Sequence, residues 1–284
     1  MKKYFSLVLF AHSIFAMPFA FIGFFLGIQL VGAQFSWFLL ICVILCMVFA
    51  RNAAMAFNRY LDRDIDAINP RTQDRDIPAG KIKAKEALTF VILNCILFII
   101  TTYFINTLCF MLSPVALFVV LFYSYTKRFT PLCHLVLGLG LALAPIGAYI
   151  AVTGQFNLIP LFYSFAVLFW VSGFDIIYAL QDEGFDKDQN LHSIPSWLGA
   201  KKALLLSRVL HIFSALFVVL PIFFIDFTWA YYVGVACFWA MLIYQHSLVK
   251  PYDLSKVNRA FATANGYASV VFALFFLLDN YLKS

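Results

Sequence analysis

Two groups of acidic and amide side chains recur in this sequence at helical spacing. Four-residue steps separate the members of the first group: Asn58, Asp62 and Asp66. Steps of seven and four residues separate the members of the second group: Asp175, Asp182 and Asp186. On an α-helix such steps keep side chains on one face, with a drift of roughly 40° per four-residue step. The sequence therefore predicts two stripes of oxygen-bearing side chains, called here the first and second acidic stripes.

The two acidic stripes have the chemistry of a magnesium site. They offer carboxylate and amide oxygens and contain neither His nor Cys, which favours Mg²⁺ over zinc or copper. Because Mg²⁺ is usually held by a few carboxylates together with substrate phosphates, a phosphorylated ligand is expected. The alternative is a solvated surface. It is disfavoured because acids are unfavourable at helix C-terminal ends and this chain has only 14 acids in 284 residues.

The elements that must position these stripes are membrane helices. Hydrophobic residues make up 63% of the chain and charged residues 12%, against about 45–50% and about 25% in soluble domains. A hydrocarbon core of about 30 Å needs about 20 apolar residues per helix. The sequence therefore predicts an all-α membrane protein with nine transmembrane helices, at residues 7–31, 37–57, 87–106, 108–126, 133–153, 158–181, 203–224, 228–249 and 258–282.

Loop charge predicts the orientation of these helices. With a cytoplasmic N-terminus, only Lys283 of the 20 basic residues lies on the far side of the membrane, which is the positive-inside pattern. Both acidic stripes then lie at cytoplasmic helix ends and run into two long loops, 58–86 and 182–202. Segments 81–88 and 188–202 are expected to form short surface helices over a cavity. Since four helices separate the stripes, helices 1–4 and 5–8 are predicted to be pseudo-repeats, with helix 9 extra.

Three motifs resemble those of the UbiA superfamily of intramembrane prenyltransferases, and the resemblance covers essentially the full chain. The first motif is NRYLDRDID at 58–66, followed by PRT and RDIPAG. The second is FDIIYALQDEGFD at 174–186, and a third cue is YSYTKRFT at 123–130. Two positions depart from the family pattern. Arg59 stands where an Asp is usual, which removes one possible ligand, and Asp76 stands where a Pro is usual.

The resemblance implies a single domain over residues 1–284, built as a helical bundle around a central cavity that is capped on the cytoplasmic side. Both acidic stripes would hold Mg²⁺ on a polyprenyl diphosphate, and three of their members would carry the chemistry: Asp66, Asp182 and Asp186. The basic residues implied to contact the diphosphate are Arg71, Lys127 and Arg128. Arg75 lies in the same loop as Arg71 and is a further candidate for an anion contact.

Four more residues are candidates for substrate contacts. Arg51 lies two helical turns before Asn58 on the same face, where it could orient the diphosphate or an acceptor carboxylate; the alternative is a buried ion pair with an Asp. Tyr123 and Tyr178 lie beside the motifs, where their rings could stabilise an allylic cation. His12, near the cytoplasmic end of the first predicted helix, is a candidate acceptor contact, with simple packing as the alternative.

The predicted activity is Mg²⁺-dependent transfer of a polyprenyl group to the ring of a hydroxylated aromatic acid in ubiquinone or menaquinone synthesis. The second motif and the LHSIP segment resemble 4-hydroxybenzoate polyprenyltransferases, especially a subgroup that is attributed to menaquinone synthesis and uses a dihydroxynaphthoate. Both acceptors stay open. The alternatives are a haem-O-synthase-like farnesyltransferase and a cation-coupled transporter, whose site would usually lie near the membrane midplane.

The predicted location is the inner (plasma) membrane of a bacterium, with several membrane passes and an active site that faces the cytoplasm. The expected partners are the polyprenyl diphosphate, the small aromatic acceptor and the lipid bilayer. No nucleic-acid partner is expected.

Overall fold

The computed structural model describes residues 15–283, and within them the regular structure is helical apart from one isolated bridge between Lys250 and Asp253. The elements are α2 (Met17–Val31), α3 (Trp37–Leu61), α4 (Arg63–Ile68), α5 (Ala84–Ile105), α6 (Thr107–Thr126), α7 (Cys133–Thr153), α8 (Leu158–Ala179), η2 (Leu180–Asp182), α9 (Glu183–Asp188), α10 (Ile194–Phe217), η3 (Leu220–Phe223), α11 (Trp229–Leu248), η4 (Arg259–Ala264) and α12 (Asn265–Lys283).

Each predicted membrane segment from residue 37 onward coincides with a helix, within a few residues at most ends, although α10 begins at Ile194 and not at residue 203. Seven helical segments of the described chain are long and apolar enough to cross a membrane. The described part of the first predicted segment forms the shorter apolar helix α2, and α11 is not among the seven. The chain is thus an all-α, multi-pass membrane protein. Nine spans, the pseudo-repeat and the orientation stay predictions.

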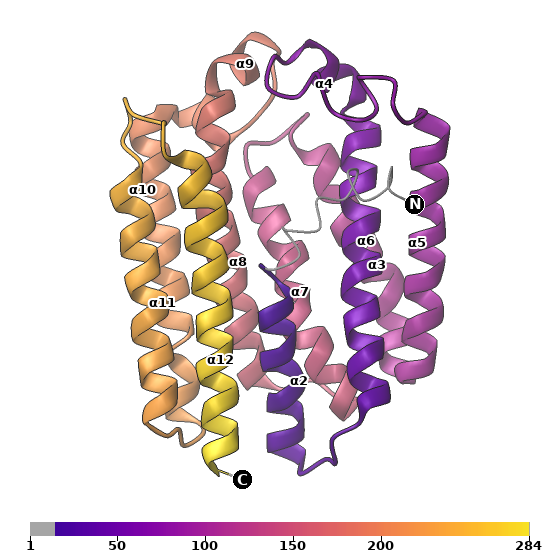
Figure 1. Cartoon of the computed structure of the whole chain (residues 1–284), viewed down its shortest axis with the longest axis vertical. Helices are drawn as coiled ribbons and strands as arrows, with labels where there is room; N and C mark the ends of the chain where they lie inside the picture. Colours follow the sequence, from indigo (N-terminus) through magenta and orange to yellow (C-terminus); the bar gives the residue numbers. More distant parts are fainter. Residues whose placement is uncertain (1–14, 284) are drawn as a thin grey trace.

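The helices form one bundle. Helices that are close in the sequence pack against each other, and the last helix packs against the first described one. α3 packs against α5 and α6, α6 against α7, α7 against α8, and α8 against α10. α11 packs against α12, which in turn packs against α2, and α2 contacts α7. Figure 1 shows the result, with α10, α11 and α12 on one side, α3, α5 and α6 on the other, and α2 between them.

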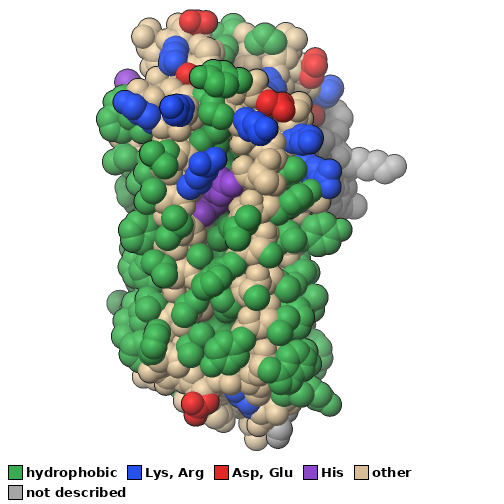
Figure 2. Space-filling model, turned by 90° about the vertical axis from the view of Figure 1, so that its left-hand side faces the viewer, with side chains coloured by type: hydrophobic (Ala, Val, Ile, Leu, Met, Phe, Trp, Pro, Cys, Tyr) green, Lys and Arg blue, Asp and Glu red, His purple; other side chains and the backbone are tan. Residues whose placement is uncertain are grey.

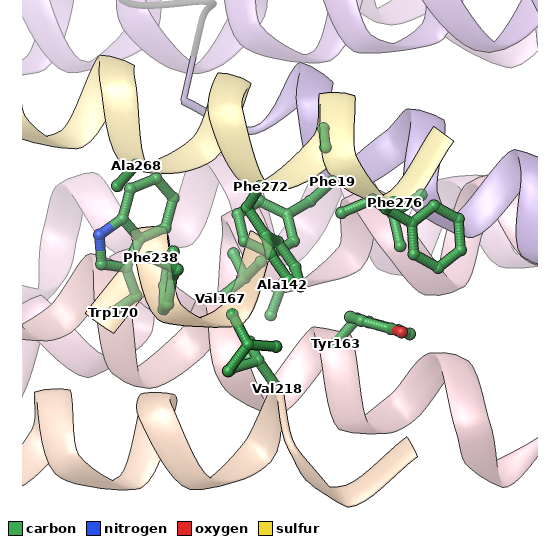
Figure 3. Close-up of a cluster of buried hydrophobic side chains, with 14 of the residues drawn as sticks. Phe19, Ala142, Tyr163, Val167, Trp170, Val218, Phe238, Ala268, Phe272 and Phe276 are labelled. Carbon is green, nitrogen blue, oxygen red and sulfur yellow. The ribbon is translucent and has the colours of Figure 1, made fainter. Parts of the chain in front are cut away.

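Aromatic side chains fill the core of the half that contains α8, α11 and α12. Phe19 of α2 contacts the rings of Trp170, Phe238 and Phe272, with ring centroids 5.5–6.3 Å apart. All four side chains are buried (Figure 3). Tilted and edge-on aromatic pairs of this kind stabilise a core beyond the area that they bury. This half is therefore a packed scaffold.

The ends of the helices explain why the loops at the lower end in Figure 1 are short. α6 is capped by Asn106, whose side chain accepts a hydrogen bond from the backbone N–H of Cys109 at 2.8 Å. α8 starts in the same way at Asn157. α2 and α7 each end at a glycine with a left-handed backbone, Gly32 and Gly154, a conformation that costs glycine little.

The two long loops lie together at the other end of the bundle. Figure 1 shows α4 and α9 side by side there, and Figure 2 shows most Lys, Arg, Asp and Glu side chains of one face gathered at this end. The expectation of a short helix at 81–88 is wrong, because residues 81 and 82 form a bend, Lys83 caps α5, and Ala84 already begins that long helix. The short helix of the first loop is α4, which directly continues the first acidic stripe. In the second loop, Gly199 (φ 76°) separates the first turn of α10 from the rest.

Candidate active site

The first acidic stripe lies where α3 passes into α4. The Asn58 side-chain amide donates a hydrogen bond to Asp62 Oδ2 at 3.0 Å, one helical turn further on. Asp62 ends α3 and precedes α4, and its Oδ1 lies 2.8 Å from Arg128 Nη2. Asp66 of α4 is 5% exposed, and both of its carboxylate oxygens accept from Arg75 Nη1, at 2.8 and 2.9 Å. In this structure, each carboxylate of the stripe is thus neutralised by its own arginine.

The second acidic stripe leaves α8 through η2 and α9. Asp182 of η2 accepts from Arg71 through both oxygens, with Nε 2.9 Å from Oδ1 and Nη2 on Oδ2. Its Oδ1 also accepts from the side-chain amide of Asn69 at 3.3 Å. Asp186 of α9 is 1% exposed and lies 2.7 Å from Lys127 Nζ. The second stripe is therefore also paired with basic groups that come from other segments.

These ion pairs bring the two acidic stripes into one site. Arg71 belongs to the loop of the first stripe but holds Asp182 of the second stripe. Lys127 and Arg128 are neighbours in the chain, yet Lys127 contacts the second stripe and Arg128 contacts the first. Since one dipeptide reaches both stripes, the stripes lie across the same small space at one end of the bundle, as the positions of α4 and α9 in Figure 1 also show.

Two of the paired groups outside the membrane-spanning helices have shifted pKa values. Burial raises the pKa of the Asp62 carboxyl above its usual range, and the positive charge of Arg128 opposes this only in part. Burial acts to lower the pKa of Arg71. That pKa nevertheless lies above its ordinary value, because the hydrogen bonds and negative charge of Asp182 outweigh the burial. Both shifts reflect charged groups that are held out of water and depend on one another.

Asp175 has a different kind of partner from the other stripe members. Its Oδ2 lies 2.7 Å from Nδ1 of His134, at the start of α7. His134 is 3% exposed, and its Nε2 accepts from the backbone N–H of Ile194 at 3.3 Å. With Nε2 accepting, Nδ1 is the ring nitrogen that carries the hydrogen donated to Asp175. Asp175 is thus set apart from the Lys- and Arg-paired acids, although its spacing predicts the same face.

Sequence reasoning missed two residues of this site. His134 fell inside an apolar segment, where a lone His carries no spacing signal. Its only cue is its position six residues after Arg128 of the basic motif. Asn69 lies directly before Pro70, and no spacing in the sequence singles out its side chain. It is 7% exposed and donates to Asp182, while its Oδ1 accepts from the backbone N–H of Arg71.

A cavity of about 360 Å³ lies between α2, α3, α5, α6 and α7. Its walls are almost entirely apolar, and Arg51 is the one charged residue among the described residues that line it. The Nε of Arg51 is buried without a hydrogen-bond partner, and no ion pair among residues 15–283 involves this side chain. The alternative of a buried ion pair between Arg51 and an Asp is therefore not found. Tyr123 also lines the cavity.

The other aromatic and histidine candidates lie elsewhere. The Tyr178 hydroxyl accepts from Arg71 Nη1 at 3.0 Å, and the Arg71 guanidinium lies 5.2 Å from the centre of the Tyr178 ring. The Tyr178 ring also contacts the ring of Phe261, with centroids 4.2 Å apart. Tyr178 thus lies at the acidic stripes and is not among the residues that line the cavity. His12 lies outside the described residues.

The donor set fits Mg²⁺ on a phosphate-bearing ligand, but it does not form a ready-made cage. Within residues 15–283, no three His, Cys, Asp or Glu side chains lie close enough to hold a metal ion on their own. The carboxylates of both stripes nevertheless face one space and are hard oxygen donors of the type that Mg²⁺ prefers. A Mg²⁺ ion here would need phosphate oxygens as well, which is the usual arrangement for this metal.

Comparison with known proteins gives one consistent family. A 4-hydroxybenzoate octaprenyltransferase from Vibrio parahaemolyticus is 28% identical over 245 residues, which cover 84% of each chain. The enzyme of the same name from Aliivibrio salmonicida is 30% identical over 248 residues, covering 84% of this chain and 83% of that protein.

Solved structures show the same fold. The apo structure of a UbiA homolog from Aeropyrum pernix K1 has a TM-score of 0.85 at 30% identity and covers 94% of this chain and 98% of that one. A UbiA homolog from Archaeoglobus fulgidus, solved with DMAPP and Mg²⁺, has a TM-score of 0.76 at 21% identity and covers 99% of both chains. The profile of the UbiA prenyltransferase family matches residues 16–276. The chain therefore belongs to the UbiA prenyltransferase family and is a membrane-embedded transferase.

Proposed function

We propose that this protein transfers a polyprenyl group from a polyprenyl diphosphate to the ring of a hydroxylated aromatic acid, either 4-hydroxybenzoate or a dihydroxynaphthoate. One observation carries the proposal. The two acidic stripes, about 120 residues apart in the chain, share one space and are bridged by Arg71, Lys127 and Arg128. The bases of this site can bind the diphosphate, and its carboxylates can bind the Mg²⁺ that accompanies the diphosphate.

The ion pairs of the structure suggest how the diphosphate is received. Arg71, Lys127 and Arg128 now neutralise Asp182, Asp186 and Asp62. When the diphosphate binds, these bases turn to its oxygens, because phosphate oxygens accept charge-assisted N–H bonds from guanidinium and ammonium groups at least as well as a carboxylate does. Asp62, Asp182 and Asp186 would then be free to hold Mg²⁺, whose positive charge would replace that of the bases.

The chain's own groups then stabilise the departing diphosphate. Mg²⁺, held by Asn58, Asp62, Asp66, Asp175, Asp182 and Asp186, would supply further positive charge on the leaving oxygens when it is bound. The basic residues aim N–H donors at the same oxygens, so that charge which develops as the allylic C1–O bond breaks meets groups already in place. Asp182 or Asp186 accepts the proton that the acceptor ring loses after attack on C1.

The cavity offers a place for the apolar part of the substrates. It lies between α3, α5, α6 and α7, next to the end of α3 that bears the first acidic stripe, and its walls are apolar. A prenyl tail buried there contributes roughly 0.8 kcal/mol per CH₂ group removed from water. Arg51 in the wall needs an anion, which the substrate diphosphate or the carboxylate of an aromatic acid would supply.

The test is an assay of purified protein in nanodiscs with Mg²⁺, a labelled polyprenyl diphosphate and each acceptor in turn. Asp66→Ala and Asp186→Ala should lower turnover by at least about 1,000-fold, a loss of about 4 kcal/mol or more in transition-state stabilisation. Asp74→Ala is the matched control, because Asp74 is an exposed acid in the same loop that takes part in no ion pair of the described chain. Full turnover by Asp66→Ala and Asp186→Ala would refute the assignment.

The proposed location is the bacterial inner membrane with the acidic stripes on the cytoplasmic side. The charge pattern of the loops supports this, and relatives of the chain are bacterial proteins. Reporter fusions after Gly80 and after Gly154 should give opposite results, the first cytoplasmic and the second external. Equal reporter signals would contradict the orientation.

A further inference from the structure

Asp175 differs from the other four acids of the two stripes, because each of those pairs with an Arg or a Lys. Within residues 15–283, the only ion-pair partner of Asp175 is His134, whose Nδ1 lies 2.7 Å from Asp175 Oδ2. The His134 side chain is 3% exposed, while that of Asp175 is 23% exposed. A cation can therefore reach the Asp175 carboxylate without first displacing a basic side chain.

Asp175 also lies near the first acidic stripe, although it belongs to the second. Tyr123 of α6 is close enough to both Asp62 and Asp175 for the two carboxylate charges to act on its ring hydroxyl. Tyr123 in turn lines the apolar cavity. Since one tyrosine lies near an acid of each stripe, Asp175 borders the space where the stripes meet the cavity.

The two partners of His134 fix the hydrogen on its ring. Nε2 lies 3.3 Å from the backbone nitrogen of Ile194, which can only donate, so Nε2 accepts. Nδ1 must then carry the hydrogen that His134 donates to Asp175. An imidazole with one hydrogen is neutral. It stabilises the Asp175 carboxylate through a hydrogen bond, yet it leaves the negative charge of that carboxylate available to a cation.

The backbone that holds the His134 ring also holds a base of the site. His192 and Ile194 lie in one short stretch at the start of α10. The His192 N–H donates to the backbone oxygen of Lys127 at 2.8 Å, and the Ile194 N–H donates to the His134 ring. This stretch therefore fixes Asp175, through His134, relative to the turn that carries Lys127.

We propose that His134 is a positioning residue that holds Asp175 as the first anchor of the Mg²⁺ ion, an inference that rests on the proposed function. The hydrogen bond to Oδ2 fixes the rotation of the carboxylate and leaves Oδ1 for the metal. Because Asp175 has no basic partner to lose, it binds the ion before the ion pairs of the other acids rearrange. Side chains that orient a metal ligand in this way commonly change metal affinity by about 10- to 100-fold when they are replaced.

The experiment measures metal binding to the intact protein in nanodiscs, with Mn²⁺ as the probe and a prenyl thiodiphosphate, whose C–S bond resists cleavage, in place of the donor. Free Mn²⁺ is followed by electron paramagnetic resonance. His134→Leu should weaken Mn²⁺ binding about tenfold or more. His134→Asn, whose amide can donate from near the position of Nδ1, should bind within about threefold of wild type. His211→Leu is the matched control, because it removes another buried histidine that contacts α8, at the Trp170 backbone oxygen, and it should bind Mn²⁺ as wild type does.

A double variant separates positioning from a general loss of structure. If His134 acts through Asp175, His134→Leu should add no further loss of Mn²⁺ affinity to Asp175→Ala. Should His134→Leu fold poorly, His134→Phe makes the same comparison with a ring of similar shape.

Wild-type Mn²⁺ affinity in His134→Leu would overturn the inference, and so would a further loss in the double variant. Failure of the proposed function would look different: wild type would bind Mn²⁺ with the thiodiphosphate but transfer no prenyl group to either acceptor.

Discussion

Lys127 Nζ lies 2.7 Å from Oδ1 of Asp186, and the Asp186 side chain is 1% exposed while that of Lys127 is 32% exposed. The acid is thus sealed inside the protein, whereas its base can still reach toward the space between the stripes. An anion that enters this space can attract Lys127 without moving Asp186. On the proposed function, Lys127 is therefore the member of the pair that would turn toward the diphosphate.

Removal of Lys127 alone should destabilise the protein, because the buried Asp186 carboxylate then has no counter-charge. Lys127→Met leaves the Asp186 carboxylate unpaired in a nearly dry position. We expect a loss of stability of about 1–3 kcal/mol, at the low end for buried pairs because the lysine is partly solvated. The measurement is the apparent unfolding midpoint in detergent. The double variant Lys127→Met/Asp186→Asn should regain most of the stability but no transferase activity. A double variant as unstable as Lys127→Met would contradict this account.

The geometry of Arg71 should matter more than its charge. Arg71 meets both oxygens of Asp182 and also donates to the Tyr178 hydroxyl, a combination that one ammonium group cannot reproduce. Arg71→Lys is expected to lower kcat/KM about 10- to 100-fold, or about 1.4–2.8 kcal/mol in transition-state stabilisation. Steady-state kinetics with the preferred acceptor checks it. Arg63→Lys, which alters a partly exposed arginine outside these pairs, should change kcat/KM less than about threefold.

A bulky side chain in the cavity should make the enzyme prefer donors with shorter prenyl chains. Ala116 lines the cavity from α6, and Ala116→Phe would place a ring in a space of about 360 Å³. We expect kcat/KM to fall much more for a long polyprenyl diphosphate than for geranyl diphosphate. Val115→Phe, one residue earlier and 59% exposed, should leave the ratio unchanged. An equal loss for both donors would place the tail elsewhere.

The close contact between α2 and α7 should leave no room for the methyl group of an alanine at position 23. A Cβ at Gly23 would collide with the backbone carbonyl of Pro145, which cannot move aside as a side-chain tip can. Gly23→Ala is expected to destabilise by about 1–3 kcal/mol, as overpacking usually does. Gly147→Ala on α7 meets no atom within 4 Å and serves as the control. Thermal unfolding of both variants decides the point, and equal midpoints would disprove the tight contact.

A buried acid at the far end of the bundle should affect stability but not catalysis. Asp279 is fully buried, accepts from the Thr228 hydroxyl at 2.7 Å and lies 2.6 Å from Lys283 Nζ. Asp279→Ala removes the group that holds the start of α11 to the end of α12, with an expected cost of about 3 kcal/mol. Activity per folded molecule should stay within twofold of wild type. A selective loss of kcat would mean that this end communicates with the acidic stripes.

The chain alone determined most of the helical segments and the spacing of the two acidic stripes, while the metal chemistry that the stripes favour stays a prediction. These properties depend on local patterns, namely apolar runs of membrane length and polar residues at helical spacing. The start and end of α7 at residues 133 and 153, for example, follow directly from the sequence. The same reasoning placed the short helix of the first loop at the wrong residues, because loop conformation depends on what the loop packs against.

Only the tertiary structure decided which base meets which acid. Lys127 and Arg128 are equivalent in sequence, yet they contact opposite stripes because the turn after α6 lies between the ends of α3 and α8. His134 joined the site only because α7 packs along α8 and carries its ring to Asp175. Spacing along one helix gives the face on which a side chain lies, while its partner is set by helices that come from elsewhere in the chain.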